Sequence, residues 1–233
     1  MITEGHVERE SVRLHYLMQR GDEVLTPLVY VPGSLGGADD FRAEMSRLAP
    51  RTTVAISPRG VGASSAPESG YALQDRVRDL EAVLDQLQLA PACVMAFSAG
   101  VPIALSYALQ RPNRVTALIL LDYPAVSRQL TDRWAEQAKP FAASRGIPEH
   151  VIRAMISEST TVELWEDIER ITCPILLIVG GQSPSVTAED LTRYRTAWPR
   201  LQLEVFEDSG HEVFRPDYER FMRVIERFLR EVG

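Results

Sequence analysis

The sequence predicts an α/β fold in which parallel strands are covered by helices. Two near-continuous apolar runs, at residues 115–121 and 175–179, have the pattern of strands that are buried on both faces. Segments with apolar residues at helical spacing lie between such runs, so strands and helices alternate along the chain. The 233 residues, of which 45% are hydrophobic and 24% charged, suit one globular domain. No repeat or low-complexity tract divides it, and we expect a single domain over residues 1–233.

The first half of the chain alternates short apolar runs with amphipathic segments. In chain order, we expect strands over 12–19 and 28–31 around a turn at 20–22, a helix over 39–48, a strand over 53–56 and a helix over 73–87. The last helix is the clearest, because its apolar residues share one face: Val77, Leu80, Val83, Leu84 and Leu87.

The second half continues the alternation around one long interruption. In chain order, we expect a strand over 92–95, a helix over 101–110, strands over 115–121 and 175–179, a helix over 187–195, a strand over 201–206 and a terminal helix carrying Phe221, Val224, Ile225 and Phe228. Residues 123–172 interrupt this pattern with two or three short helices and are the candidate lid. Its apolar residues are Trp134, Phe141, Ile147, Val151, Ile152, Met155, Ile156, Trp165 and Ile168. We expect most of these to pack against the body, and any that line a cleft favour an apolar substrate.

Charge and hydropathy exclude several kinds of partner. The formal net charge is -7 and no stripe of Lys or Arg occurs, which argues against nucleic acid. The longest apolar stretches are far below the roughly 20 residues that a membrane helix needs, and the N-terminus lacks a signal pattern. We therefore expect a cytoplasmic protein without a membrane partner; the oligomeric state stays open. Cys93 and Cys173 lie in or beside apolar runs, and we expect both to be reduced.

Ser98 is the most informative residue of the chain. It lies in Ala96-Phe97-Ser98-Ala99-Gly100, between a predicted strand and a predicted helix. A sharp strand-to-helix turn exposes a serine hydroxyl at the carboxyl edge of a sheet and needs small residues on both sides. The backbone N–H of Ala99 would then lie at a helix N-terminus, where it can stabilise an oxyanion. This pattern predicts a nucleophile for acyl transfer, whereas a serine that only caps the helix is the plainer alternative.

Two further segments fit a catalytic role for Ser98. His211 follows the predicted strand 201–206 in a loop, Glu207-Asp208-Ser209-Gly210-His211, from which it could reach the serine. The glycine-rich turn at residues 32–37 follows the buried strand 28–31. The N–H of Ser34 in this turn is our candidate for a second oxyanion donor.

These segments, together with Pro58-Arg59-Gly60-Val61-Gly62-Ala63-Ser64, resemble in order the landmarks of the α/β-hydrolase family. The resemblance covers nearly the whole chain. It implies a mostly parallel eight-stranded sheet, a lid after the sixth strand, and a nucleophile, an acid and a histidine in that order. Ala96 departs from the family pattern, since it replaces the first glycine around the nucleophile.

The acid of the expected triad is missing from its usual place. In the family it usually lies just beyond the seventh strand, where this chain has Ser183, and a serine cannot supply the negative charge that stabilises an imidazolium. Asp122, at the end of the predicted strand 115–121, is the best substitute, although an aspartate there could also cap a turn. Glu189 and Asp190 belong to the first turn of a predicted helix, and Asp208 lies too close to His211 to point back easily at its ring.

The remaining histidines and Arg59 have structural explanations. His6 and His15 fall in amino-terminal strands, and His150 is expected on a solvent-facing side of a lid helix. We expect Arg59 to donate to loop carbonyls at the sheet edge. No histidine pair has ligand spacing with cysteine or carboxylate, so we expect no metal and no cofactor.

The leading hypothesis is a serine hydrolase that cleaves a carboxylic ester, lactone or thioester of a small to medium substrate with an apolar portion. Ser98 would attack, His211 would act as base, Asp122 would orient it, and the N–H groups of Ser34 and Ala99 would hold the oxyanion. The alternative is a relative of the same fold with lyase or isomerase chemistry, or one that only binds a ligand, because Ser183 replaces the usual acid. A third possibility is that Ser183 stands in place of a natural acid.

Overall fold

A single eight-stranded sheet forms the centre of the molecule. The computed structural model describes all 233 residues. The strand order is β1-β2-β4-β3-β5-β6-β9-β10. The pairs β1–β2 and β2–β4 are antiparallel, and every pair from β4 to β10 is parallel. The strands are β1 (Ile2–Arg9), β2 (Val12–Gln19), β3 (Leu28–Val31), β4 (Thr53–Ile56), β5 (Ala92–Phe97), β6 (Val115–Leu121), β9 (Ile175–Gly180) and β10 (Gln202–Phe206). The predicted α/β class and the mostly parallel eight-stranded sheet are confirmed.

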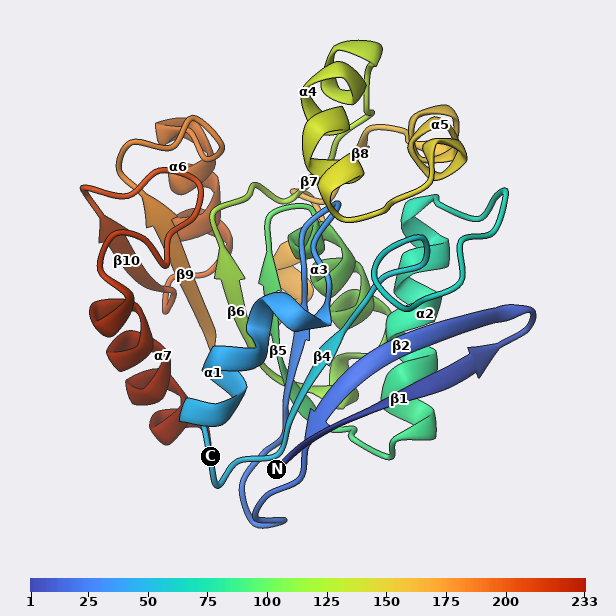
Figure 1. Cartoon of the computed structure of the whole chain (residues 1–233). Helices are drawn as coiled ribbons and strands as arrows, with labels where there is room; N and C mark the ends of the chain where they lie inside the picture. Colours follow the sequence, from blue (N-terminus) through green and yellow to red (C-terminus); the bar gives the residue numbers. More distant parts are fainter.

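Helices cover both faces of this sheet (Figure 1). They are α1 (Arg42–Arg47), α2 (Leu73–Gln86), α3 (Gly100–Gln110), α4 (Asp132–Ser144), α5 (Glu149–Glu158), α6 (Ala188–Ala197) and α7 (Tyr218–Val232), with short 3₁₀ turns η1 (Ala38–Phe41), η2 (Pro112–Arg114) and η3 (Ile168–Arg170). The predicted helix over 39–48 is thus divided into η1 and α1. None of the helices is long and apolar enough to cross a bilayer.

Alternating side chains of each strand bury the two faces separately. Val29 and Val31 of β3 belong to the apolar cluster that includes α2, α3 and α6, whereas Leu28 and Tyr30 belong to the cluster that includes α1 and α7. Because successive side chains enter two covered faces, the central parallel strands β3, β5, β6 and β9 are almost entirely apolar. Cys93 lies buried in β5 and Cys173 lies half-buried before β9, and both thiols are free. Burial raises the pKa of Cys173 to about 11.

Residues 123–172 connect β6 to β9 and lie above the carboxyl ends of the strands (Figure 1). They contain α4, α5, η3 and a small ribbon of β7 (Val126–Ser127) and β8 (Val162–Glu163). Most of the segment's apolar side chains pack as expected. Ile147, Val151, Ile152 and Met155 join body residues such as Leu35 in one cluster. Trp165 and Ile168 reach the main core.

The topology brings distant loops to one edge. In parallel strands the carboxyl ends lie on the same side of the sheet, so the segments after β3, β5, β6, β9 and β10 meet there. Ser34, Ser98, Asp122, Ser183 and His211 each follow one of these five strands. Any chemistry that combines them therefore depends on the sheet order and not on sequence proximity.

Candidate active site

Ser98 occupies the tip of the turn between β5 and α3. Its φ is +52°, in the left-handed region that is sparsely populated by residues other than glycine. The turn is held by hydrogen bonds from the Ser98 N–H to the Leu121 carbonyl and from the Val101 N–H to the Ser98 carbonyl. A Cβ at Gly100 would lie 2.5 Å from the carbonyl oxygen of Val31, so a larger residue could not follow the serine at this spacing. The strained turn presents the hydroxyl at the sheet edge.

His211 reaches Ser98 from the loop after β10. Its Nε2 lies 2.9 Å from the Ser98 Oγ, and its ring packs at a centroid distance of 4.9 Å from Phe97. The loop can approach because Gly180 ends β9: a Cβ there would lie 2.1 Å from the Gly210 carbonyl oxygen. The histidine side chain is 38% exposed, so one edge of the ring faces the cavity that adjoins the serine.

Asp122 contacts the other ring nitrogen. The side chain is completely buried at the end of β6, and its Oδ2 lies 2.7 Å from the Nδ1 of His211. The Gly180 N–H donates to Oδ1 at 2.9 Å, and the Ser183 hydroxyl donates to Oδ2. These donors compensate for the loss of water around a buried carboxylate. Asp122 also has a positive φ of +50°, which aspartate tolerates better than most residues.

The hydrogen-bond partners determine which ring nitrogen carries the proton. An ionised Asp122 can only accept, so Nδ1 of His211 must be the protonated nitrogen. Nε2 then has a free lone pair, which can accept the proton of Ser98. The arrangement can therefore perform general-base activation of a hydroxyl nucleophile.

The other predicted acids lie away from the histidine. Asp190 accepts hydrogen bonds from Thr187 at the start of α6, and Glu189 and Asp208 are exposed without a contact to His211. Ser183, at the usual acid position, bonds to Asp122 instead of to the ring. The missing acid was the reason for the non-hydrolytic alternative, and Asp122 makes the contact that this acid would make.

Sequence reasoning overlooked Ser185. Its Oγ lies 3.1 Å from the Nδ1 of His211, beside the bond to Asp122. The Ser185 N–H in turn donates to the Ser183 Oγ. The segment Gly180-Gly181-Gln182-Ser183-Pro184-Ser185 contains two serines. Two hydroxyl groups in the loop where the acid is usually found are the signal that could have identified Ser185 as a neighbour of the histidine.

The two candidate oxyanion donors lie on loops that flank the serine. Gly33 lets the turn containing Ser34 approach Ser98 closely, since a Cβ on Gly33 would lie 3.1 Å from the Ser98 Cβ. The N–H groups of Ser34 and Ala99 donate to no other backbone group. Free N–H groups at such a position can receive a developing negative charge.

A cavity of about 520 Å³ opens beside Ser98 and His211. About half of its lining residues are aromatic or aliphatic, and these include Tyr30, Phe41, Met95, Phe97, Phe214 and Phe221 from the body and Trp134, Ala138 and Phe141 from α4. Trp134 and Phe141 are thus the aromatic residues of the segment 123–172 that line this cavity.

The same cavity also has a substantial polar part, whose longer side chains are Asp40, Glu44, Gln137, Arg145, Glu212 and Arg215. Asp40 and Arg145 form an ion pair at 2.7 Å. Glu44 is only 8% exposed and its Oε2 has no hydrogen-bond partner. Burial raises the pKa of Glu44, and the nearby Asp40 raises it further. No group of His, Cys, Asp and Glu side chains is arranged to hold a metal ion.

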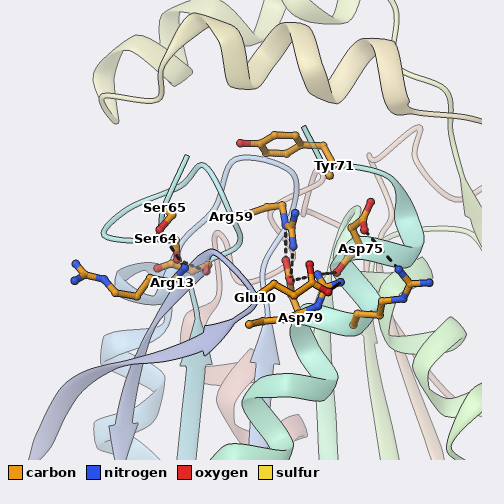
Figure 2. A network of polar contacts seen from close by, with 12 residues as sticks. Glu10, Arg13, Arg59, Ser64, Ser65, Tyr71, Asp75 and Asp79 are labelled. Carbon is orange, nitrogen blue, oxygen red and sulfur yellow. Dashed lines mark hydrogen bonds and ion pairs between the residues drawn. The ribbon is translucent and has the colours of Figure 1, made fainter. Parts of the chain in front are cut away.

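Two structural expectations are wrong in detail. Arg59 does not donate to loop carbonyls: its guanidinium donates twice to the carboxylate of Asp79 on α2, at 2.7 and 2.6 Å, and Arg9 donates to the same carboxylate (Figure 2). A bidentate pair matches the planar guanidinium better than scattered carbonyls do. His150 is half-buried and not solvent-facing, because its Nε2 bonds to the Ala66 carbonyl.

The two amino-terminal histidines, His6 and His15, make structural contacts. His15 is buried, and its Nδ1 lies 3.0 Å from the Ser57 hydroxyl. The same hydroxyl oxygen accepts the Ala38 N–H, so His15 belongs to a buried structural contact. His6 bonds through Nε2 to the Ala63 carbonyl. Both are strand residues, as expected.

Comparisons with known proteins agree with the fold. Residues 26–141 match the family described as alpha/beta hydrolase fold. RutD of Caulobacter segnis, whose name describes a carbamate hydrolase, is 31% identical over 98% of this chain and 99% of its own. The sn-1-specific diacylglycerol lipase ABHD11 of Mus musculus is 22% identical over 93% of this chain and 85% of its own. An esterase from Exiguobacterium antarcticum has a TM-score of 0.80 with 18% identity, covering 97% of this chain and 98% of that one. The chain belongs to the α/β-hydrolase fold family.

Proposed function

We propose that this protein is a serine hydrolase that cleaves a carboxylic ester, lactone or thioester through an acyl-enzyme on Ser98. The observation that carries the proposal is an unbroken series of short contacts. Asp122 Oδ2 lies 2.7 Å from His211 Nδ1, and His211 Nε2 lies 2.9 Å from Ser98 Oγ. A buried carboxylate, an oriented imidazole and a strained serine form the arrangement that activates a hydroxyl for acyl transfer.

The first half of the reaction forms the acyl-enzyme. His211 Nε2 takes the proton of Ser98 while Oγ bonds to the acyl carbon, and the former carbonyl oxygen becomes an oxyanion. The N–H groups of Ser34 and Ala99 donate to that oxyanion. The bond to the leaving alcohol then breaks, and the proton on Nε2 passes to the leaving oxygen. Asp122 stays ionised throughout and stabilises the transient imidazolium.

The second half returns the enzyme to its starting state. Water gives a proton to Nε2 and its oxygen bonds to the acyl carbon. When the tetrahedral intermediate collapses, the bond to Ser98 breaks and the serine oxygen recovers the proton from His211. The products are a carboxylic acid and a free serine.

The cavity supports a small or medium substrate with an apolar portion. A volume of about 520 Å³ with aromatic walls is within the range of small-molecule sites, and hydrophobic side chains dominate such sites. Relatives whose names describe a lipase and an esterase are consistent with ester cleavage, while another relative is named an N-formylmaleamate deformylase. Ester cleavage is the reaction we propose.

The decisive experiment is covalent labelling. The protein is incubated with a fluorophosphonate, and intact mass and peptide mapping give the stoichiometry and the site. We expect rapid labelling of one serine, Ser98, and none in Ser98→Ala. Ser144→Ala, which changes an exposed serine at the end of α4, is the matched control and should label as the parent does. Absence of labelling in the parent protein, together with no turnover of p-nitrophenyl acetate, would contradict the proposal.

A further inference from the structure

A second cavity shares Ser34 with the large one. It has a volume of about 50 Å³ and lies between α2, α3 and the segment 123–172. Ser34 lines both cavities, and Ala99 lines this one, so it adjoins both candidate oxyanion donors. The charged residues in its lining are Arg76 and Arg128, and no carboxylate is among them. The cavity therefore has a strongly positive character next to the reacting atoms.

The Arg76 side chain has no ionic or hydrogen-bond partner within the protein, although it is half-buried. The two nearby carboxylates are already engaged: Asp79 accepts from Arg59 and Arg9 (Figure 2), and Glu158 accepts the backbone N–H groups of Gly70 and Tyr71. Burial lowers the pKa of the Arg76 guanidinium, while the nearby carboxylates of Asp79 and Glu158 raise it without bonding to it. A desolvated charge without a partner is costly, and it is expected where a ligand supplies the partner.

Arg128 approaches the same cavity from the lid. Its guanidinium lies over the Tyr123 ring at 5.4 Å, and its one hydrogen bond, to the Ser185 carbonyl, is long at 3.4 Å. The side chain is exposed, so it can turn toward an anion in the cavity at little cost. Hydroxyl groups of Ser127, Ser159 and Thr160 complete the polar lining.

We propose that this cavity is a carboxylate subsite, in which Arg76, assisted by Arg128, binds a carboxylate of the substrate next to the scissile carbonyl. The inference rests on the proposed function, since it names the substrate class of the same site. A guanidinium presents parallel N–H groups that match the two oxygens of a carboxylate.

The two cavities together define the substrate. The reacting carbonyl lies between them at Ser98, an apolar portion occupies the large cavity, and a carboxylate occupies the small one. We infer that the preferred substrates are esters that carry a free carboxylate a few bonds from the scissile carbonyl, such as half-esters of short dicarboxylic acids.

The test compares a charged ester with a neutral one of the same chain length. kcat/KM is measured for mono-p-nitrophenyl succinate and for p-nitrophenyl butyrate, and for p-acetoxybenzoate against phenyl acetate, which places the carboxylate on the leaving group. We expect the parent protein to prefer the charged member of at least one pair. Arg76→Met should lower that preference by roughly 10- to 100-fold, the range for loss of a hydrogen bond to a charged group. Arg128→Met, an exposed site where folding is not at risk, should lower it by a smaller factor.

The control is Arg78→Met, which removes an exposed arginine from the same helix and should leave both rates unchanged. A parent protein without preference in either pair, or an Arg76→Met variant that loses charged and neutral activity equally, would overturn the proposal.

A binding measurement separates this inference from the catalytic one. In a Ser98→Ala background no acyl-enzyme forms, and the Kd of mono-p-nitrophenyl succinate is measured by calorimetry with and without Arg76→Met. Weaker binding in the double variant supports the carboxylate subsite even if Ser98 fails to label with a fluorophosphonate. Equal binding rejects the subsite even if Ser98 is the nucleophile.

Discussion

Replacing Asp122 by asparagine removes one charge and reverses one hydrogen bond. The Gly180 N–H donates to Oδ1 at 2.9 Å, so the amide oxygen of the introduced asparagine is held at this position. The amide NH₂ then occupies the place of Oδ2, which is 2.7 Å from the Nδ1 of His211. Because an amide NH₂ can only donate, it selects the imidazole that is protonated on Nε2. That nitrogen can no longer accept the proton of Ser98.

The expected loss follows from both changes. In the serine protease example, the same substitution lowers kcat by about 10⁴-fold, because it favours the wrong tautomer and removes the charge that stabilises the imidazolium. A factor of about 10⁴ corresponds to about 5.4 kcal/mol of activation free energy. We expect a loss of this order for Asp122→Asn here. Its circular dichroism spectrum should match that of the parent protein.

The assay is steady-state hydrolysis of p-nitrophenyl acetate, combined with the rate of fluorophosphonate labelling at Ser98. Both rates should fall together, since both depend on the activated hydroxyl. Asp208→Asn is the matched control: it removes an exposed carboxylate three residues before His211 and should leave both rates unchanged. If Asp122→Asn keeps more than a tenth of the parent turnover, or if Asp208→Asn loses as much, the assignment of the acid is wrong.

Three further predictions concern the residues around the site and the body. Ser183→Asp should lower turnover and the Tm, because the new carboxylate would lie beside the buried carboxylate of Asp122, as steady-state kinetics and thermal unfolding would reveal. Asp79→Ala should destabilise the protein by about 3–5 kcal/mol, a Tm decrease of roughly 6–20 °C in calorimetry, because it leaves Arg59 buried without its partner. Burial lowers the pKa of His15, and the nearby His6 lowers it further. The contribution of neutral His15 to stability is therefore complete above the pKa of the unfolded chain, about 6.5, and is lost as the pH falls below that pKa. His15→Asn should therefore flatten the dependence of Tm on pH between about 7.5 and 5.5.

Each of these predictions has an outcome that contradicts it. A sharp rise in turnover of Ser183→Asp would mean that this position is the natural acid site. A Tm change below about 1 °C in Asp79→Ala would mean that the buried ion pair makes no net contribution to the free energy of unfolding, as is often found for exposed pairs. An unchanged pH dependence in His15→Asn would assign acid sensitivity to other groups.

The fold class and most element boundaries could be predicted from local patterns. The strands at 12–19, 28–31, 53–56 and 115–121 have the predicted limits. In the last three, burial on both faces makes most positions apolar. The division of residues 38–47 into η1 and α1 was not predicted. A 3₁₀ turn and an α-helix share similar side-chain spacing, and packing of Phe41 and Met45 under the sheet selects between them.

Local patterns in the chain were enough to identify the family landmarks: a serine between a strand and a helix, a histidine after the last strand, and a glycine-rich turn after an early one. Asp122 could be favoured over Asp190 and Asp208 from the sequence, because it ends a predicted strand. Its contact with the ring of His211 could be read only from the folded molecule, because that contact depends on which parallel strand ends meet at the sheet edge. Arg76 could not be singled out from the sequence either. An arginine without a partner is recognised only when the positions of all charged groups around it are known. Sequence patterns report local conformation and burial, whereas a site made from several strand ends depends on distances that the sheet order sets.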